Sequence, residues 1–211
     1  MSYFLTHLLM YANPFPLLNL ASVVRQTRAL GPGMRAAVWV QGCPLRCAGC
    51  ISPAWTEARV NRLVSPARLL EETLANNPQI EGLTLSGGEP FAQPQALAAF
   101  LRLARAARPE LSVLCFSGFR LENLRRMPAA AELLEQIDTL IDSPYILSLD
   151  DNRGLRGSSN QRVHHLSQRM AGYDFEHAPR QAEMYLGTEL TLVGVPPRGL
   201  LAALDQAGGI V

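Results

Sequence analysis

Three of the chain's four cysteines lie close together, at Cys43, Cys47 and Cys50, in the spacing Cys-x3-Cys-x2-Cys. Cysteine thiolates hold iron–sulfur clusters, normally with one thiolate on each iron of a cubane. Three thiolates leave one iron open, and an open iron can chelate a substrate. Gly49 lets the backbone of the loop approach such a group closely. The spacing therefore predicts a [4Fe–4S] cluster with one open coordination position.

A zinc site and three free thiols are the alternatives to a cluster. Structural zinc takes four ligands in paired short spacings, and no fourth Cys or His lies near this loop. The nearest pair of histidines in the sequence beyond it, His164 and His165, follows far along the chain. Clustered cysteines of this kind do not resemble a disulfide framework and suit a reducing cytoplasm.

A glycine-rich turn and two later polar residues are further candidates. Ser86-Gly87-Gly88-Glu89-Pro90 offers bare backbone to a ligand, and Glu89 could accept a hydrogen bond from an ammonium group. Such a run is more often only a turn. Ser117 and Asp142 each end an apolar segment, where the ordinary role of Ser or Asp is to cap local backbone.

The elements around these residues alternate between strand and helix. Strands are expected at 36–40, 82–86, 111–116 and 139–142, and helices start at Pro66 and at Pro94, with 121–136 mostly helical. This alternation is typical of βαβ units on a parallel sheet, whose strands end at one edge. We expect the candidate segments to meet at that edge. Beyond them we expect a polar loop at 150–161, a strand at 189–193 and a helix at 198–206.

Composition limits the function classes. The chain has 211 residues, 48 % hydrophobic and 18 % charged, which suits one folded domain. A net charge of +1 gives no electrostatic footprint for nucleic acid. Pro14 and Pro16 interrupt the apolar N-terminus, which has no basic residue ahead of it, so we expect neither a signal peptide nor a membrane span.

Together these motifs resemble those of radical S-adenosylmethionine enzymes, and within that group the activating enzymes of anaerobic ribonucleotide reductase. The resemblance covers residues 19–195 of a single domain, 1–211, and leaves residues 1–18 as an N-terminal extension. It rests on the cysteine loop and on five further segments, which are Gly31-Pro32-Gly33-Met34-Arg35, residues 86–91, residues 117–119, residues 141–145 and residues 156–162.

The resemblance implies a fold, a chemistry and a set of contacts. The fold would be a partial (β/α)6 TIM-like barrel of about six parallel strands. The methionyl amine and carboxylate of S-adenosylmethionine would chelate the open iron, and an electron from the cluster would release methionine and a 5′-deoxyadenosyl radical. The implied metal ligands are Cys43, Cys47 and Cys50, and the implied cofactor contacts are Gly49, Gly87, Gly88, Glu89, Ser117 and Asp142. Family members commonly have Asp-Gly where this chain has Asp142-Ser143.

The target of the radical is open at this point. The resemblance favours a glycyl-radical partner protein, with a flavodoxin or ferredoxin as electron donor. A radical enzyme that acts directly on a small molecule or peptide is the main alternative. A non-catalytic cluster module is a lesser one, because an open iron beside a glycine-rich turn argues for a bound substrate.

Overall fold

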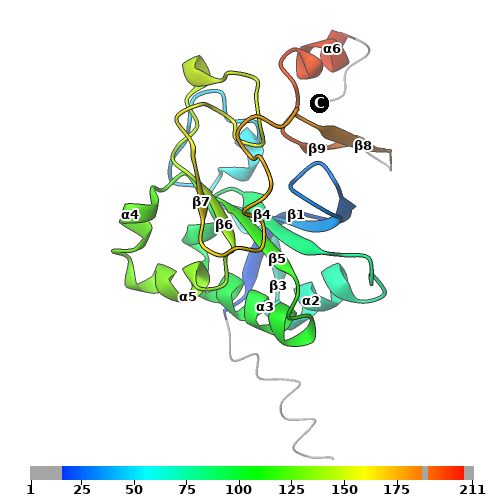
Figure 1. Cartoon of the computed structure of the whole chain (residues 1–211), viewed down its shortest axis with the longest axis vertical. Helices are drawn as coiled ribbons and strands as arrows, with labels where there is room; N and C mark the ends of the chain where they lie inside the picture. Colours follow the sequence, from blue (N-terminus) through cyan, green and yellow to red (C-terminus); the bar gives the residue numbers. More distant parts are fainter. Residues whose placement is uncertain (1–15, 187–189, 207–211) are drawn as a thin grey trace, which may run out of the picture.

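The computed structural model describes residues 16–186 and 190–206. Seven strands form one sheet in the order β3-β1-β2-β4-β5-β6-β7, and β8 and β9 form a separate pair (Figure 1). The strands are β1 (Leu18–Thr27), β2 (Arg35–Val40), β3 (Arg62–Val64), β4 (Gly82–Gly87), β5 (Ser112–Phe116), β6 (Thr139–Asp142), β7 (Arg162–His165), β8 (Ala182–Leu186) and β9 (Leu190–Gly194). The α-helices are α2 (Pro66–Leu74), α3 (Pro94–Ala107), α4 (Leu121–Leu124), α5 (Ala131–Leu134) and α6 (Leu200–Gln206).

The middle of the large sheet is parallel and its two ends are antiparallel. Strands β2, β4, β5 and β6 run in one direction, whereas β1 is antiparallel to β2 and β7 is antiparallel to β6. The expected α/β fold around a parallel sheet is confirmed, but the expectation of six parallel strands is wrong. Residues 28–34 join β1 to β2 and are too few for the crossover that a parallel pair needs.

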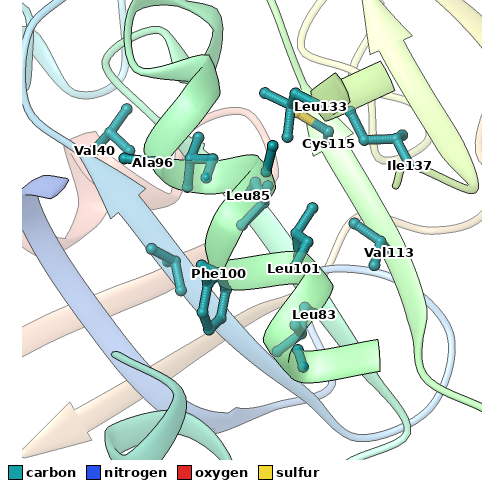
Figure 2. Close-up of a cluster of buried hydrophobic side chains, with 14 of the residues drawn as sticks. Val40, Leu83, Leu85, Ala96, Phe100, Leu101, Val113, Cys115, Leu133 and Ile137 are labelled. Carbon is teal, nitrogen blue, oxygen red and sulfur yellow. The ribbon is translucent and has the colours of Figure 1, made fainter. Parts of the chain in front are cut away.

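One face of the sheet packs on helices. Ala36, Val38 and Val40 of β2 point into a cluster formed with α2, α3 and α5. Figure 2 shows Phe100 and Leu101 of α3 among the side chains of β4 and β5. Cys115, the cysteine outside the loop, is fully buried in this cluster and serves as a core residue.

The other face packs on the late part of the chain. Alternate residues of the same strand, Ala37 and Trp39, belong to a second cluster that includes Ile141 of β6. Most of the residues that cover this face come from the segments after β6, namely Leu155, Met170, Phe175 and Val193, and Leu30 from the segment before β2 joins them. Strand β2 is therefore buried on both faces, as its continuous apolar sequence predicts.

The sequence signals located most of the helices. The side chain of Ser65 caps α2, since its Oγ accepts a hydrogen bond from Arg68 N at 3.2 Å, and α3 spans Pro94–Ala107 as expected. The segment 121–136 is helical only in short pieces, α4, η3 (Pro128–Ala130) and α5, because proline has no amide hydrogen to continue a helix. The strand and helix expected near the C-terminus correspond to β9 and α6. Strands β1, β3, β7 and β8 were not anticipated.

The ends of the chain add two facts. Except for residues 16–18, the expected extension 1–18 lies outside the described residues, and Leu18 already belongs to β1. Within residues 16–186 and 190–206, no helix combines the length and apolar character needed to cross a bilayer.

A fully buried arginine joins the N-terminal ends of three parallel strands. Arg35 Nε donates to Thr84 Oγ1 at 2.7 Å, Nη1 donates to Ser112 Oγ at 2.9 Å and to Pro32 O at 3.0 Å, and Nη2 donates to Leu83 O at 2.7 Å and to Ser112 O at 3.2 Å. All five donors of the guanidinium are thus used. Burial lowers the pKa of Arg35 to about 10, which leaves the group charged at neutral pH.

We predict that Arg35→Met lowers the free energy of unfolding by about 3 kcal/mol or more, because several buried acceptors lose their donors together. Arg62→Met is the matched control, since Arg62 makes an exposed ion pair with Glu72 and its loss should cost less than about 1 kcal/mol. Urea unfolding of both variants and the wild type measures the difference. Equal losses in the two variants would contradict the role given to Arg35.

Candidate functional site

The candidate segments meet at the C-terminal edge of the parallel strands. The cysteine loop, residues 42–50, follows β2, and the glycine turn follows β4. The two are joined by hydrogen bonds from Gly88 N to Val40 O at 2.7 Å and from Glu89 N to Gly42 O at 2.9 Å. Ser117 N in turn donates to Ile141 O at 2.9 Å. The expected convergence of the four strand ends is therefore present.

The three loop cysteines are half-buried and unpaired. Cys43 N donates to Thr56 O at 3.1 Å, and Cys50 N donates to Cys47 O at 3.2 Å, so the loop folds back on itself and on the segment after it. A hollow of about 430 Å³ is lined by Cys47, Cys50 and their neighbours Arg46, Gly49, Pro53 and Thr56. Gly49 has a φ of +75°, in the left-handed region that favours glycine.

The donor set of this loop fits an iron–sulfur cluster. In the part of the chain that the structure describes, no group of three or more His, Cys, Asp or Glu is arranged to hold a single metal ion. A cubane takes one thiolate on each of several irons, so its ligands lie farther apart than those of one ion. Cys47 and Cys50 line the hollow, Cys43 lies on the same loop, and thiolates are the ligands that such clusters take.

Gly87 and Gly88 bring the backbones of two loops into contact. A Cβ on Gly88 would lie 2.2 Å from Gly42 O, and a Cβ on Gly87 would lie 2.5 Å from Val40 N. Gly87 also has a φ of +106°. Any side chain here would push the turn away from the cysteine loop. The bare backbone that the sequence suggested for a ligand is used at least in part against the protein itself.

Glu89 and Ser117 are in direct contact. The Glu89 carboxyl group is 1 % exposed. Its Oε1 accepts from Ser117 Oγ at 2.9 Å and from Phe91 N at 3.0 Å, and its Oε2 accepts from Gly118 N at 2.8 Å. Burial raises the pKa of Glu89 to about 7, although these hydrogen bonds act in the opposite direction. No ion pair to Glu89 is present among residues 16–186 and 190–206.

Asp142 lies at the same edge but has its own set of partners. Its fully buried carboxylate accepts hydrogen bonds from Leu121 N at 2.7 Å, Ser143 Oγ at 3.0 Å and Arg162 Nε at 2.9 Å, and it lies 2.9 Å from His164 Nε2. Burial raises the pKa of Asp142, but the hydrogen bonds from Arg162, Leu121 and Ser143 outweigh it, so the net pKa is lowered. These contacts engage both oxygens with the protein.

Ser143 stands at the position where the resemblance implies glycine. Its φ is +84°, so the backbone keeps a glycine-like shape with a serine in place. The hydrogen bond from its hydroxyl to Asp142 offsets part of the strain. The turn after β6 therefore holds a serine in the left-handed region that favours glycine.

Comparison with known proteins identifies the family. The sequence profile described as "4Fe-4S single cluster domain" matches residues 29–164, a stretch that contains all three loop cysteines. The chain belongs to the 4Fe-4S single cluster domain family. It is also 33 % identical over 146 residues to the anaerobic ribonucleoside-triphosphate reductase-activating protein of Escherichia coli K12, covering 64 % of this chain and 91 % of that protein.

Two further relatives extend the comparison. The protein of the same name from Enterobacteria phage T4 is 31 % identical over 137 residues, covering 63 % of this chain and 85 % of that protein. The pyruvate formate-lyase-activating enzyme of Clostridium pasteurianum is 39 % identical over 80 residues, which cover 36 % of this chain and 33 % of the enzyme. The resemblance to radical S-adenosylmethionine activases is confirmed, and the cofactors are a [4Fe–4S] cluster and S-adenosylmethionine.

Two glutamines that sequence reasoning missed hold the start of the cysteine loop. Gln93 Nε2 donates to Gln41 O at 3.0 Å and to Asn19 O at 2.9 Å. Gln41 Nε2 donates to Glu57 O at 2.8 Å. Neither residue belongs to a motif, and their partners are distant in the sequence. His164, to which no role was given, was missed because the polar residues of β7 have no strand-like alternation.

We predict that the buried carboxyl group of Glu89 makes stability depend on pH. The pKa is raised from 4.5 in the unfolded chain to about 7 in the fold. The stability contributed by its protonated form is therefore complete below pH 4.5 and is lost as the pH rises through about 7. The loss has an upper limit of about 3 kcal/mol. The free energy of unfolding is measured against pH for the cofactor-free wild type and for Glu89→Gln, whose side chain does not titrate. As the pH rises over this range, the wild type should lose stability relative to Glu89→Gln.

A difference between the two proteins that is constant with pH would contradict this assignment of the pKa. Glu81→Gln serves as a control, because Glu81 lies at the opposite edge of the sheet, where its Oε1 accepts from Met34 N.

Proposed function

We propose that Cys43, Cys47 and Cys50 hold the [4Fe–4S] cluster, and that the chain uses it to cleave S-adenosylmethionine and install a glycyl radical on a partner enzyme. The observation that carries the proposal is the direct packing of the cysteine loop on the glycine turn that bears Glu89. The cluster ligands and a buried carboxyl group thus share one edge of the sheet. When bound, the cluster supplies one electron that breaks the sulfur–C5′ bond of the cofactor, giving methionine and a 5′-deoxyadenosyl radical.

Glu89 is proposed to recognise the methionyl ammonium of S-adenosylmethionine. A buried carboxyl group with a raised pKa and no cation beside it gains stability when a positive charge arrives. Its Oε2 accepts one hydrogen bond, from Gly118 N, and has capacity to accept another. Ser117 and Gly118 N hold the carboxyl group in place, and Gly87 and Gly88 set its distance from the cysteine loop.

Three other residues that were expected to contact the cofactor are proposed to act indirectly. Asp142 is proposed to position the loop after β5 through Leu121 N, since its oxygens are already engaged with the protein. Ser117 is proposed to act mainly through Glu89, to which its hydroxyl donates. Gly49 is proposed to give the cysteine loop its left-handed turn.

A protein is the proposed target of the radical. Both groups of relatives are named as activators of another enzyme, an anaerobic ribonucleoside-triphosphate reductase or pyruvate formate-lyase. The chain spans nine-tenths of the Escherichia coli activating protein, which favours a protein target over direct action on a small molecule or peptide. We propose a glycyl-radical enzyme as partner and a flavodoxin or ferredoxin as electron donor.

The proposal also covers the fold, the domain organisation and the cell compartment. The open sheet would correspond to part of a barrel, with β2, β4, β5 and β6 as its parallel strands. Residues 1–211 would act as one domain, with 19–195 as the family-like core. Unpaired cysteines, three of them on one loop, suit a reducing cytoplasm.

We predict that the reduced protein alone releases 5′-deoxyadenosine slowly from S-adenosylmethionine. An anaerobic ribonucleotide reductase should accelerate the release, because hydrogen abstraction needs the reacting atoms within about 3–3.5 Å and only the bound partner supplies them. The hydrogen atom passes from a glycine α-carbon to C5′, which leaves a radical on the partner's backbone. Chromatography of the nucleoside and electron paramagnetic resonance of the partner measure the two products.

Cys47→Ala should abolish both products by removing a cluster ligand. Cys115→Ala is the matched control and should retain both products, since Cys115 is buried in the cluster between the sheet and the helices. If a small metabolite stimulates turnover and no protein does, the activase role fails while cleavage of the cofactor stands.

A further inference from the structure

The segment Ser158–Arg162 lies antiparallel to the loop that follows β6. Backbone pairing between β6 and β7 runs from Thr139 opposite His165 to Asp142 opposite Arg162. Beyond that pair the ladder ends, because Asp142 is the last residue of β6 and Arg162 is the first of β7. Residues 143–149 therefore need other partners to keep a fixed shape.

Side chains of the segment supply most of those partners in register. Gln161 Nε2 donates to Ser143 O at 3.0 Å, and Asn160 Nδ2 donates to Pro144 O at 2.8 Å. Ser158 Oγ accepts from Ile146 N at 3.1 Å. As the residue number falls on one side it rises on the other, so these contacts continue the antiparallel pairing.

The segment also holds its own shape. Gln161 Oε1 accepts from Gly157 N at 2.7 Å and from Ser158 N at 3.2 Å. Ser159 N donates to Leu149 O at 2.8 Å, which ties the far end of the facing loop. The polar residues of Ser158–Gln161 thus hold the loop 143–149 from its start to its end.

The facing loop ends in a short helix that touches the cysteine loop. Leu147 is the first residue of η4 (Leu147–Leu149) and is 59 % exposed. Its Cδ1 and Cδ2 lie 3.2 Å from the place where a Cβ on Gly49 would be, so the side chain contacts the cysteine loop at Gly49. Gly49 lies between Cys47 and Cys50. The loop after β6 runs beside the cysteine loop at the top of the molecule in Figure 1.

We propose that Ser158–Gln161 is a positioning element for the iron–sulfur cluster, and that it acts through Leu147 on Gly49. The inference rests on the proposed function, which places the cluster on Cys43, Cys47 and Cys50. Leu147 contacts the loop between two of the three ligands, so its side chain limits how far this part of the loop can move. Groups that support metal ligands in this way affect retention of the metal as well as its position.

Retention of iron tests the proposal without any measurement of turnover. Full-length protein is reconstituted anaerobically, mixed with a ferrous chelator, and the decay of the charge-transfer absorbance is followed. Leu147→Ala should release iron about tenfold faster than the wild type. Leu149→Ala is the matched control, since Leu149 lies in the same helix and is 42 % exposed. It should release iron at the wild-type rate, as should Leu147→Met, which conserves volume.

Gln161→Ala should release iron as fast as Leu147→Ala, and adding Leu147→Ala to it should give little further effect. Thermal unfolding of the cofactor-free variants at Leu147 and Leu149 should match the wild type, because both side chains are exposed. Equal release from Leu147→Ala and Leu149→Ala would overturn the inference while leaving the cluster site in place. A wild-type protein that never assembles a cluster would overturn the proposed site and this inference together.

Discussion

Glu89 lies two residues after the end of β4 and is 1 % exposed, and both oxygens of its carboxyl group accept hydrogen bonds from the loop after β5. Its own amide donates to Gly42 O at the start of the cysteine loop. One residue therefore fixes three loops relative to one another at the edge where chemistry is proposed. Gly87 and Gly88 make this contact possible, because a side chain on either would separate the two backbones. A buried carboxyl group without a cation beside it costs stability, and a cationic ligand at this edge would offset that cost.

A buried arginine joins the strands at one edge of the parallel sheet, and two buried carboxyl groups join the loops at the other. At the N-terminal edge, the Arg35 guanidinium satisfies its donors on Pro32, β4 and β5, and no ligand is needed. At the C-terminal edge, Glu89 and Asp142 join neighbouring loops, and of these two carboxyl groups only Asp142 has a cationic partner among the described residues, Arg162. Stability and function are thus separated along the strands, as is common where ligands bind at the carboxyl ends of a parallel sheet.

Local patterns in the sequence predicted the local structure well. The apolar run at 36–40, the cap at Ser65 and the periodic residues of 94–107 each specify an element without reference to the rest of the chain. The antiparallel strands β1 and β7 escaped prediction because their identity depends on partners distant in the sequence. The same holds for the site. The spacing of cysteines indicates a cluster by itself, whereas the contact of Ser117 with Glu89 and the contact of Leu147 with Gly49 exist only after folding.

We propose that a cluster held by the cysteine loop would have one iron open to S-adenosylmethionine beside Glu89. The most direct test is electron–nuclear double resonance of the reduced protein mixed with S-adenosylmethionine that carries nitrogen-15 in its methionyl amine. We expect S-adenosylmethionine to alter the resonance of the cluster and the labelled nitrogen to be coupled to it. A cluster whose spectrum is unchanged by S-adenosylmethionine, with no coupling to the label, would rule out binding of the methionyl amine to the open iron.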